Sequence, residues 1–222
     1  MSKTSASLEI TTIGTRVSNC YLLKTGSGFF LVDTGVSFLR DRLKKALAAA
    51  GCRREDLKLV VITHADFDHT GNCAWLKKNY DVNIAVHPDE VAALESGSML
   101  ASRKNRRNVI AMAVVKVFGL FAFRRFKPDI DLQDGDDLSP YGLDARIIHL
   151  PGHTTGHIGV LTGEGDLFCG DLLGNEKRPE KFSLVDDEDD MNASIARLSD
   201  LPVRTVYPGH GQPFAFSELG IK

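Results

Sequence analysis

One short segment limits the possible folds of this chain more than any other, because an apolar run leads directly into a cluster of polar side chains. Residues 57–62 read LKLVVI, and residues 63–72 read THADFDHTGN. A continuous apolar run of this length is typical of a strand that is buried in a sheet. The polar cluster then follows the carboxyl end of a strand, which is where open α/β sheets hold their ligands.

Short β-rich runs and helical segments occur along most of the chain. The runs in both halves predict sheets covered by helices on their outer faces, a layered α/β arrangement. No stretch has the composition of a linker, so we expect a single domain over residues 1–222. Strands are expected at 8–13, 20–25, 29–35, 57–63, 82–87, 143–150, 157–162, 166–171 and 203–208, and helices at 38–51, 71–80 and 191–201.

The polar cluster contains four side chains of the kinds that bind divalent metals. Alternate residues of an extended segment point the same way, so His64 and Asp66 can converge on one point. Asp68 and His69 lie where the chain turns into a helix and can face a neighbouring point. Imidazole and carboxylate together suit divalent transition metals. The alternative is a polar loop in which Asp68 caps the helix and the histidines are solvated.

Three further metal-binding side chains lie at or near the ends of later β-rich runs. They are His153 in LPGHTTGH, Asp171 in LFCGD and His210 in VYPGH. Exposed polar residues without a function would not be expected to recur in three separate loops at strand ends. The full set therefore favours a metal site over an isolated polar loop.

The motifs FLVDTG, THADFDHTGN, LPGHTTGH, LFCGD and YPGH occur in this order. Together they resemble the five signature motifs of the metallo-β-lactamase-fold hydrolase superfamily, and they extend over nearly the whole chain. The resemblance implies an α/β fold, a four-layer αββα sandwich, with a dinuclear metal centre at one edge of its two sheets.

The family's seven metal-binding positions all have a counterpart here. The resemblance implies three ligands for a first ion, three for a second ion, and one carboxylate that bridges the two. In that order the residues are His64, Asp66 and His153; Asp68, His69 and His210; and Asp171.

Four other polar side chains are expected near these ligands without binding metal. Asp33, in FLVDTG, matches a residue that usually supports the site through hydrogen bonds. We expect His157 to play a similar part, with orientation of a ligand or movement of protons as the alternative. His87, which precedes a proline, and His149 are expected to have structural roles.

Asp66 departs from the family pattern, in which most members have histidine at this position. Two divalent ions and three carboxylates leave a charge of +1, where two carboxylates would leave +2. We therefore expect a weaker Lewis acid and a shift of preference from zinc toward iron or manganese. Two zinc ions remain the expected cofactor, with iron or manganese as alternatives. The acidic residue also resembles the pattern of flavodiiron proteins, whose flavin-binding domain this chain has no room for.

Residues 89–127 interrupt the β-rich pattern and are expected to form a helical insertion beside the metal cleft. Apolar residues recur at helical spacing over 103–127 and also fill the other faces, so this helix must be buried or must cover something. Three roles are open: packing on a sheet, a lid or wall of the cleft, and a homodimer interface. The arginines that flank the apolar run could attract an anionic group of a substrate.

The resemblance implies metal-dependent hydrolysis, in which a metal-bridging hydroxide attacks the substrate and Asp68 accepts its proton. We favour a small-molecule ester, thioester or lactone because the expected pocket wall is apolar. A non-haem di-iron oxidoreductase, a phosphodiesterase and a non-enzymatic sensor are the alternatives. GHTTGHIG also resembles glyoxalase II, but only about a dozen residues follow His210. That enzyme has a glutathione-binding helical domain there, so glutathione thioesters are not expected.

Composition narrows the partners and the compartment. The chain has 27 basic and 29 acidic residues, a net charge of −2, so no nucleic-acid partner is expected. No apolar run reaches the roughly 20 residues that a membrane span needs. The N-terminus lacks a secretory signal pattern, and the four cysteines lack CxxC spacing. We therefore expect a cytoplasmic protein with reduced thiols.

Overall fold

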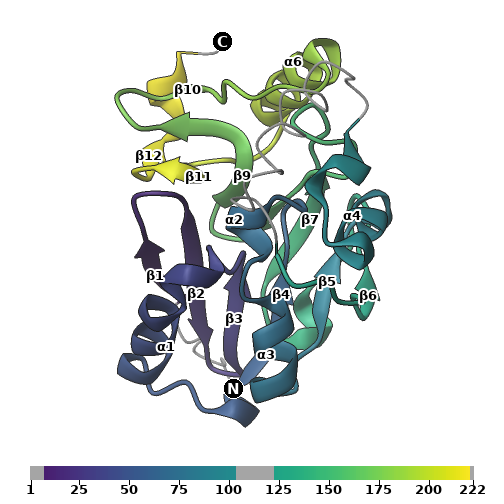
Figure 1. Cartoon of the computed structure of the whole chain (residues 1–222). Coiled ribbons are helices and arrows are strands. Elements are labelled where there is room, and N and C mark those ends of the chain that lie inside the picture. Colours follow the sequence, from purple (N-terminus) through teal and green to yellow (C-terminus); the bar gives the residue numbers. More distant parts are fainter. Residues whose placement is uncertain (1–7, 104–122, 221–222) are drawn as a thin grey trace, which may run out of the picture.

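Two six-stranded sheets form the centre of the protein (Figure 1). The structure is a computed structural model, and it describes residues 8–103 and 123–220. The first sheet is antiparallel from β1 to β3 and parallel from β3 to β6. In spatial order its strands are β1 (Glu9–Gly14), β2 (Asn19–Thr25), β3 (Gly28–Val32), β4 (Leu57–Val61), β5 (Ile84–Val86) and β6 (Ile130–Asp131).

The second sheet is built from the C-terminal half of the chain. Its central pair, β9 and β11, runs parallel, while β7, β8 and β9 are antiparallel neighbours. In spatial order its strands are β12 (Phe214–Ala215), β11 (Thr205–Gly211), β9 (Asp166–Asn175), β8 (Ile158–Thr162) and β7 (Ala145–His149), with β10 (Glu180–Lys181) paired to β9.

Helices lie along the sheets, with α1 and α3 beside the first sheet and α6 beside the second (Figure 1). The described α-helices are α1 (Arg40–Ala49), α2 (Phe67–Thr70), α3 (Cys73–Tyr80), α4 (Val91–Ser96) and α6 (Glu188–Arg197). Short 3-10 helices occur at Ser37–Leu39, Arg54–Asp56, Pro88–Glu90, Met99–Ser102, Ser139–Tyr141, Leu198–Asp200 and Phe216–Leu219.

Three apolar clusters show that these elements form four layers. Leu22 and Leu31 pack with α1, α3 and α4 on the outer face of the first sheet. Phe30 and Leu23, one residue away along the same strands, pack against the second sheet instead. Met191 of α6 covers the far face of the second sheet. Since alternate residues of a strand point to opposite faces, strands buried on both sides produce this arrangement. The expected αββα sandwich is confirmed.

Most of the predicted strands and helices are present, with differences at the edges of the sheets and around the metal-binding motif. The two-residue strands β6, β10 and β12 were not predicted, nor was the short helix α2. Strand β9 continues through Asn175, beyond the predicted end. Gly51, with φ of +71°, follows α1 as the expected C-terminal cap. The four cysteines are buried and unpaired, as expected.

The predicted helical insertion at 89–127 is covered only in part by the described residues. Its first part contains α4 and the 3-10 helix Met99–Ser102, and residues 123–127 have no helix or strand. The rest, 104–122, lies outside the described residues. Most of the segment that was expected to form a lid, a wall of the cleft or a dimer interface therefore lies outside them as well. Within the described part of the chain, no helix is long and apolar enough to cross a membrane.

Candidate metal centre

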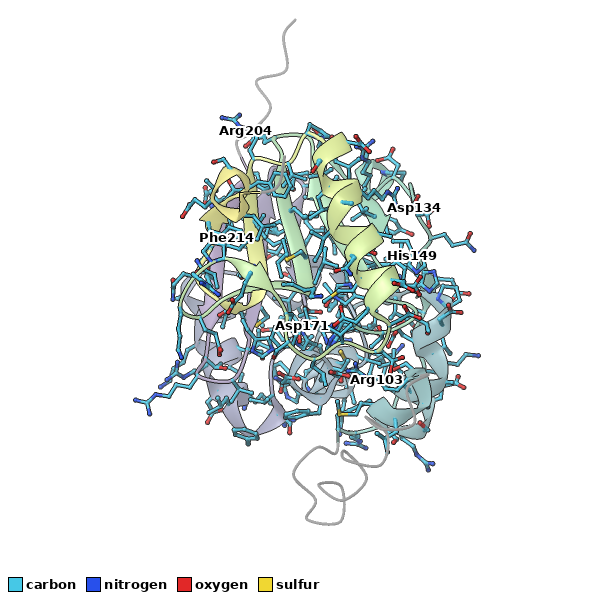
Figure 2. All side chains as sticks on the ribbon, turned by 90° about the horizontal axis from the view of Figure 1, so that it is seen from above. Arg103, Asp134, His149, Asp171, Arg204 and Phe214 are labelled. Carbon is cyan, nitrogen blue, oxygen red and sulfur yellow. The ribbon has the colours of Figure 1, made fainter. Side chains whose placement is uncertain are left out.

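The seven predicted ligands come together where strands of both sheets end. His64 follows β4 and His153 follows β7, while Asp171 and His210 lie within the neighbouring strands β9 and β11. Viewed from above the molecule, Asp171 lies in its interior (Figure 2), and its side chain is buried. The fold therefore brings into one place side chains that are far apart in the sequence.

Three groups of three side chains have the spacing of metal ligands. One of them, His64, His69 and Asp171, shares a histidine with each of the other two, which we call the first and the second group. In the first, Asp66 Oδ2 lies 3.6 Å from His64 Nε2 and 3.2 Å from His153 Nε2. These separations suit three atoms that share one ion, since zinc binds such ligands at about 2.0–2.2 Å. The first group consists of the three residues that the resemblance assigns to a first ion.

The second group contains Asp68, His69 and His210. Asp68 Oδ2 lies 3.9 Å from His69 Nε2 and 3.5 Å from His210 Nε2. Asp171 lies between the groups: its Oδ1 is 3.3 Å from His69 Nε2, and its Oδ2 is 3.8 Å from His64 Nε2. A carboxylate in this position can reach both groups, as a bridging ligand must.

The polar-loop interpretation of the motif is wrong. His64 and His69 are completely buried, so neither is solvated. Asp68 lies inside α2, whose N-cap residue is Asp66, and no side chain caps this helix. The polar side chains of this segment thus point into the protein, and none of them caps the helix or lies in solvent.

Hydrogen bonds at Nδ1 orient three of the imidazoles with their Nε2 atoms toward the centre. His69 Nδ1 donates to Asp33 Oδ2 over 2.8 Å, and His153 Nδ1 donates to the Leu184 carbonyl over 2.6 Å. His64 Nδ1 lies 3.0 Å from Thr63 Oγ1, which itself donates to Asp33. A histidine whose Nδ1 carries the proton has its lone pair on Nε2, ready to bind a metal.

Several buried atoms of the cluster lack the hydrogen bonds that burial normally demands. A cation is the partner that imidazole nitrogens and carboxylate oxygens share, so this donor set fits a metal ion. Within residues 8–103 and 123–220, the ligand atoms without a hydrogen-bond partner are His64 Nε2, Asp66 Oδ1, His69 Nε2 and Asp171 Oδ1.

The burial of opposite charges shifts the pKa of several ligands. Burial, together with the neighbouring His69 and His153, lowers the pKa of His64 to about 4. The pKa of Asp68 is raised to about 6, because burial and the nearby Asp171 outweigh the opposing effect of His69. His64 is therefore neutral at pH 7, as a metal ligand must be, and Asp68 is an ionised carboxylate of increased basicity.

The structure also places the side chains that were expected to support the ligands. Asp33 accepts hydrogen bonds from the backbone N–H and hydroxyl of Thr63 and from His69 Nδ1. His157 Nε2 accepts the Asp171 backbone N–H over 3.0 Å, so it lies next to a ligand. Away from the centre, His87 and His149 stack with 4.4 Å between ring centroids, and the backbone N–H of Asp89 donates to His87.

Two buried charged side chains beside the ligands have contacts that the sequence did not predict. Glu90 is fully buried and accepts the backbone N–H groups of Ala65 (2.9 Å) and Gly156 (3.1 Å), joining the two motif loops. Arg103, interpreted as a residue that could attract a substrate anion, forms an ion pair with the chain's own Asp66. In the sequence, Arg103 stood out only as part of a basic cluster beside the apolar run, and Glu90 did not stand out at all.

Gly209, in the YPGH motif, lies so close to the centre that there is no space for a side chain at this position. A methyl group at this position would lie 2.2 Å from Asp171 Oδ1 and 2.8 Å from His69 Cε1. Neither atom can move without leaving the centre. The glycine is therefore required by close packing against two ligands.

Comparisons with known proteins agree with this geometry. A sequence model described as the metallo-beta-lactamase superfamily matches residues 13–210. A protein named hydroxyacylglutathione hydrolase GloC, of Haemophilus influenzae, is 34% identical over 53% of this chain and 50% of its own length. An atrochrysone carboxyl ACP thioesterase of Aspergillus fumigatus is 28% identical over 87% of this chain and 50% of its own. The chain spans only about half the length of several curated relatives that it matches.

A solved structure matches nearly the full length of both chains. It is described as TTHA1623 in a di-iron-bound form, with 28% identity and a TM-score of 0.72, and the match covers 94% of this chain and 95% of that one. The fold and the number of residues are therefore close to those of a protein that was crystallised with iron.

Replacing Gly209 should disturb the centre directly. In Gly209→Ala the added methyl group displaces Asp171 or His69, and we expect metal affinity to fall at least about tenfold. Gly174→Ala is the control, because its methyl group would meet its nearest neighbour, Phe182, at 3.4 Å. Calorimetric zinc titration of both variants checks this expectation. Equal affinities in a folded Gly209→Ala protein would contradict it.

The raised pKa of Asp68 predicts that the free energy of unfolding of the metal-free protein falls as the pH rises. Its carboxyl titrates near pH 6 when folded and near pH 4 when unfolded, so its stabilising contribution is complete below about pH 4 and is lost as the pH rises through 6. Asp68→Asn should therefore raise the free energy of unfolding by about 2 kcal/mol at pH 7.5 and by less at pH 4.5.

Urea denaturation after removal of metal measures this difference. The exposed Asp41, whose replacement by Asn should have no such effect, provides the control. A gain that is the same at both pH values would show that ionisation of Asp68 is not its origin.

Proposed function

This chain belongs to the metallo-β-lactamase superfamily, and from this membership we propose that it is a hydrolase whose seven clustered side chains hold two divalent ions. The observation that carries the proposal is the position of Asp171 between two groups of three ligands. A single ion would need only one group. The complete set favours a dinuclear centre over a non-enzymatic sensor.

The chain's own residues would bind the ions and handle a proton. Two bound ions would polarise a carbonyl oxygen of the substrate and activate water as the nucleophile. Asp68 is the proposed proton acceptor, because its Oδ2 lies toward His69 and His210 while its other carboxylate oxygen would be left to take up a proton. It also retains a small exposed fraction, 7%, whereas His64 and His69 have none.

We favour an acyl substrate: a small-molecule ester, thioester or lactone. Support comes from the hydrolase and the thioesterase described above, because both names denote acyl chemistry. The chain spans only half the length of each of these proteins. We therefore propose the acyl group as the common feature of the substrate and do not assign the alcohol or thiol to which it is joined. A panel of generic esters, thioesters, lactones, phosphodiesters and β-lactams, with the metal defined first, would test the choice.

Zinc is the proposed metal, and iron is the specific rival. Asp66 adds an oxygen ligand where most relatives have nitrogen, and the full-length structural match was solved in a di-iron-bound form. These two observations favour a non-haem di-iron oxidoreductase as the second candidate. Metal analysis of protein purified without added metal separates the candidates. Near-stoichiometric iron with a reducible absorption band would favour the oxidoreductase, and zinc alone would favour the hydrolase.

The ligand assignment predicts different outcomes for two substitutions. Asp66→Ala should reduce the metal content from two ions to about one per chain and abolish most of the activity, because the first group loses its only carboxylate. His87→Ala should keep both ions and the activity, since His87 lies outside both groups and contacts Asp89 and His149. Elemental analysis after gel filtration gives the metal content. The same content in both variants would refute the assignment.

A further inference from the structure

Arg103 is a buried cation whose guanidinium reaches into the first group of ligands. It ends the 3-10 helix Met99–Ser102, and its side chain is completely buried. Nη2 donates to Asp66 Oδ2 over 2.5 Å and lies 3.2 Å from His153 Nε2, while Nη1 donates to the His153 carbonyl. His153 Nε2 also lies 3.7 Å from Asp171 Oδ2, so Arg103 and Asp171 both approach the same nitrogen.

Arg103 and the first metal ion need the same atom of His153. The Leu184 carbonyl can only accept a hydrogen bond, so the proton of the neutral imidazole lies on Nδ1. His153 Nε2 then has a single lone pair, and this atom lies 3.2 Å from Arg103 Nη2 and 3.2 Å from Asp66 Oδ2. Asp66 has a second oxygen, Oδ1, that forms no hydrogen bond within the described part of the chain. The carboxylate could therefore be shared, but the imidazole cannot.

The net charge also disfavours a metal ion at the first group relative to the second. Counting Asp66, Asp68 and Asp171 alone gave the centre three negative charges, but Arg103 neutralises one of them at the first group. Among residues 8–103 and 123–220, no lysine or arginine forms an ion pair with Asp68 or Asp171. A divalent ion at the first group thus meets a resident cation that is absent from the second.

We propose that Arg103 is an internal competitor for the first metal ion, so that the second group binds its ion more tightly and fills first. The inference rests on the dinuclear centre proposed above and deepens it by assigning a residue that sets metal affinity. Arg103 already donates hydrogen bonds to Asp66 Oδ2 and to the His153 carbonyl. The entering ion must take His153 Nε2 from the guanidinium and bind beside its positive charge, which weakens binding.

Zinc titration of the metal-free protein tests the proposal. The wild type should bind two ions in two resolved steps, and Asp66→Ala identifies the first-group step as the one that it loses. In Arg103→Met, which keeps an apolar side chain of moderate length, this step should tighten at least about tenfold, while the other step is unchanged. Arg103→Lys keeps the charge and should remain near the wild type. Arg178→Met, at an exposed position, is the control.

Circular dichroism of each variant establishes that it is folded before the titration. Tightening of the first-group step alone, or a second ion bound by Arg103→Met but not by the wild type, supports the proposal. An unchanged or weaker first-group step in folded Arg103→Met overturns it, because Arg103 would then merely support the ligands. If the wild type and Arg103→Met both bind a single ion, the dinuclear centre itself is wrong, and the inference fails with it.

Discussion

The burial of imidazole nitrogens and carboxylate oxygens that face one another is the constraint on which the rest of this structure depends. His64, His69 and His153 are completely buried, and so nearly is Asp171. Buried polar atoms without partners are costly, and ionised groups more so. Ion pairs and hydrogen bonds compensate part of this cost in the described residues, but four ligand atoms remain without a hydrogen bond. A divalent cation fits this set of atoms, because it binds imidazole nitrogens and carboxylate oxygens together.

The sandwich makes this concentration of polar groups possible, because apolar clusters on each face of both sheets hold the strand ends in place. The two sheets are also joined beside the centre. Asn19 and Tyr21, from β2, donate hydrogen bonds to the carbonyl of Pro208 in β11, which bears His210. Glu90 joins the loops after β4 and β7 in a similar way. Each ligand is thus held by its neighbours as well as by its own strand.

The β-rich runs and helical segments predicted a layered α/β arrangement, while the resemblance to a known superfamily implied the αββα sandwich and the seven clustered side chains. Apolar runs of strand length indicate strands, and short motifs at strand ends indicate ligands. The two-residue strands β6, β10 and β12 have too few residues to show such a pattern. Glu90 and Arg103 could not be predicted for a different reason. Their partners are more than 20 positions away in the sequence, so only the folded chain reveals that these charges turn inward. The omission affected the chemistry: the charge of the first group was counted without its arginine.

Anomalous diffraction from crystals grown with excess zinc tests the central claim most directly. The account predicts two peaks that share Asp171: one within about 2.0–2.3 Å of His64, Asp66 and His153, and one at similar distances from Asp68, His69 and His210. A single peak shared by all seven side chains, or ligand groups turned away from any bound ion, would contradict it.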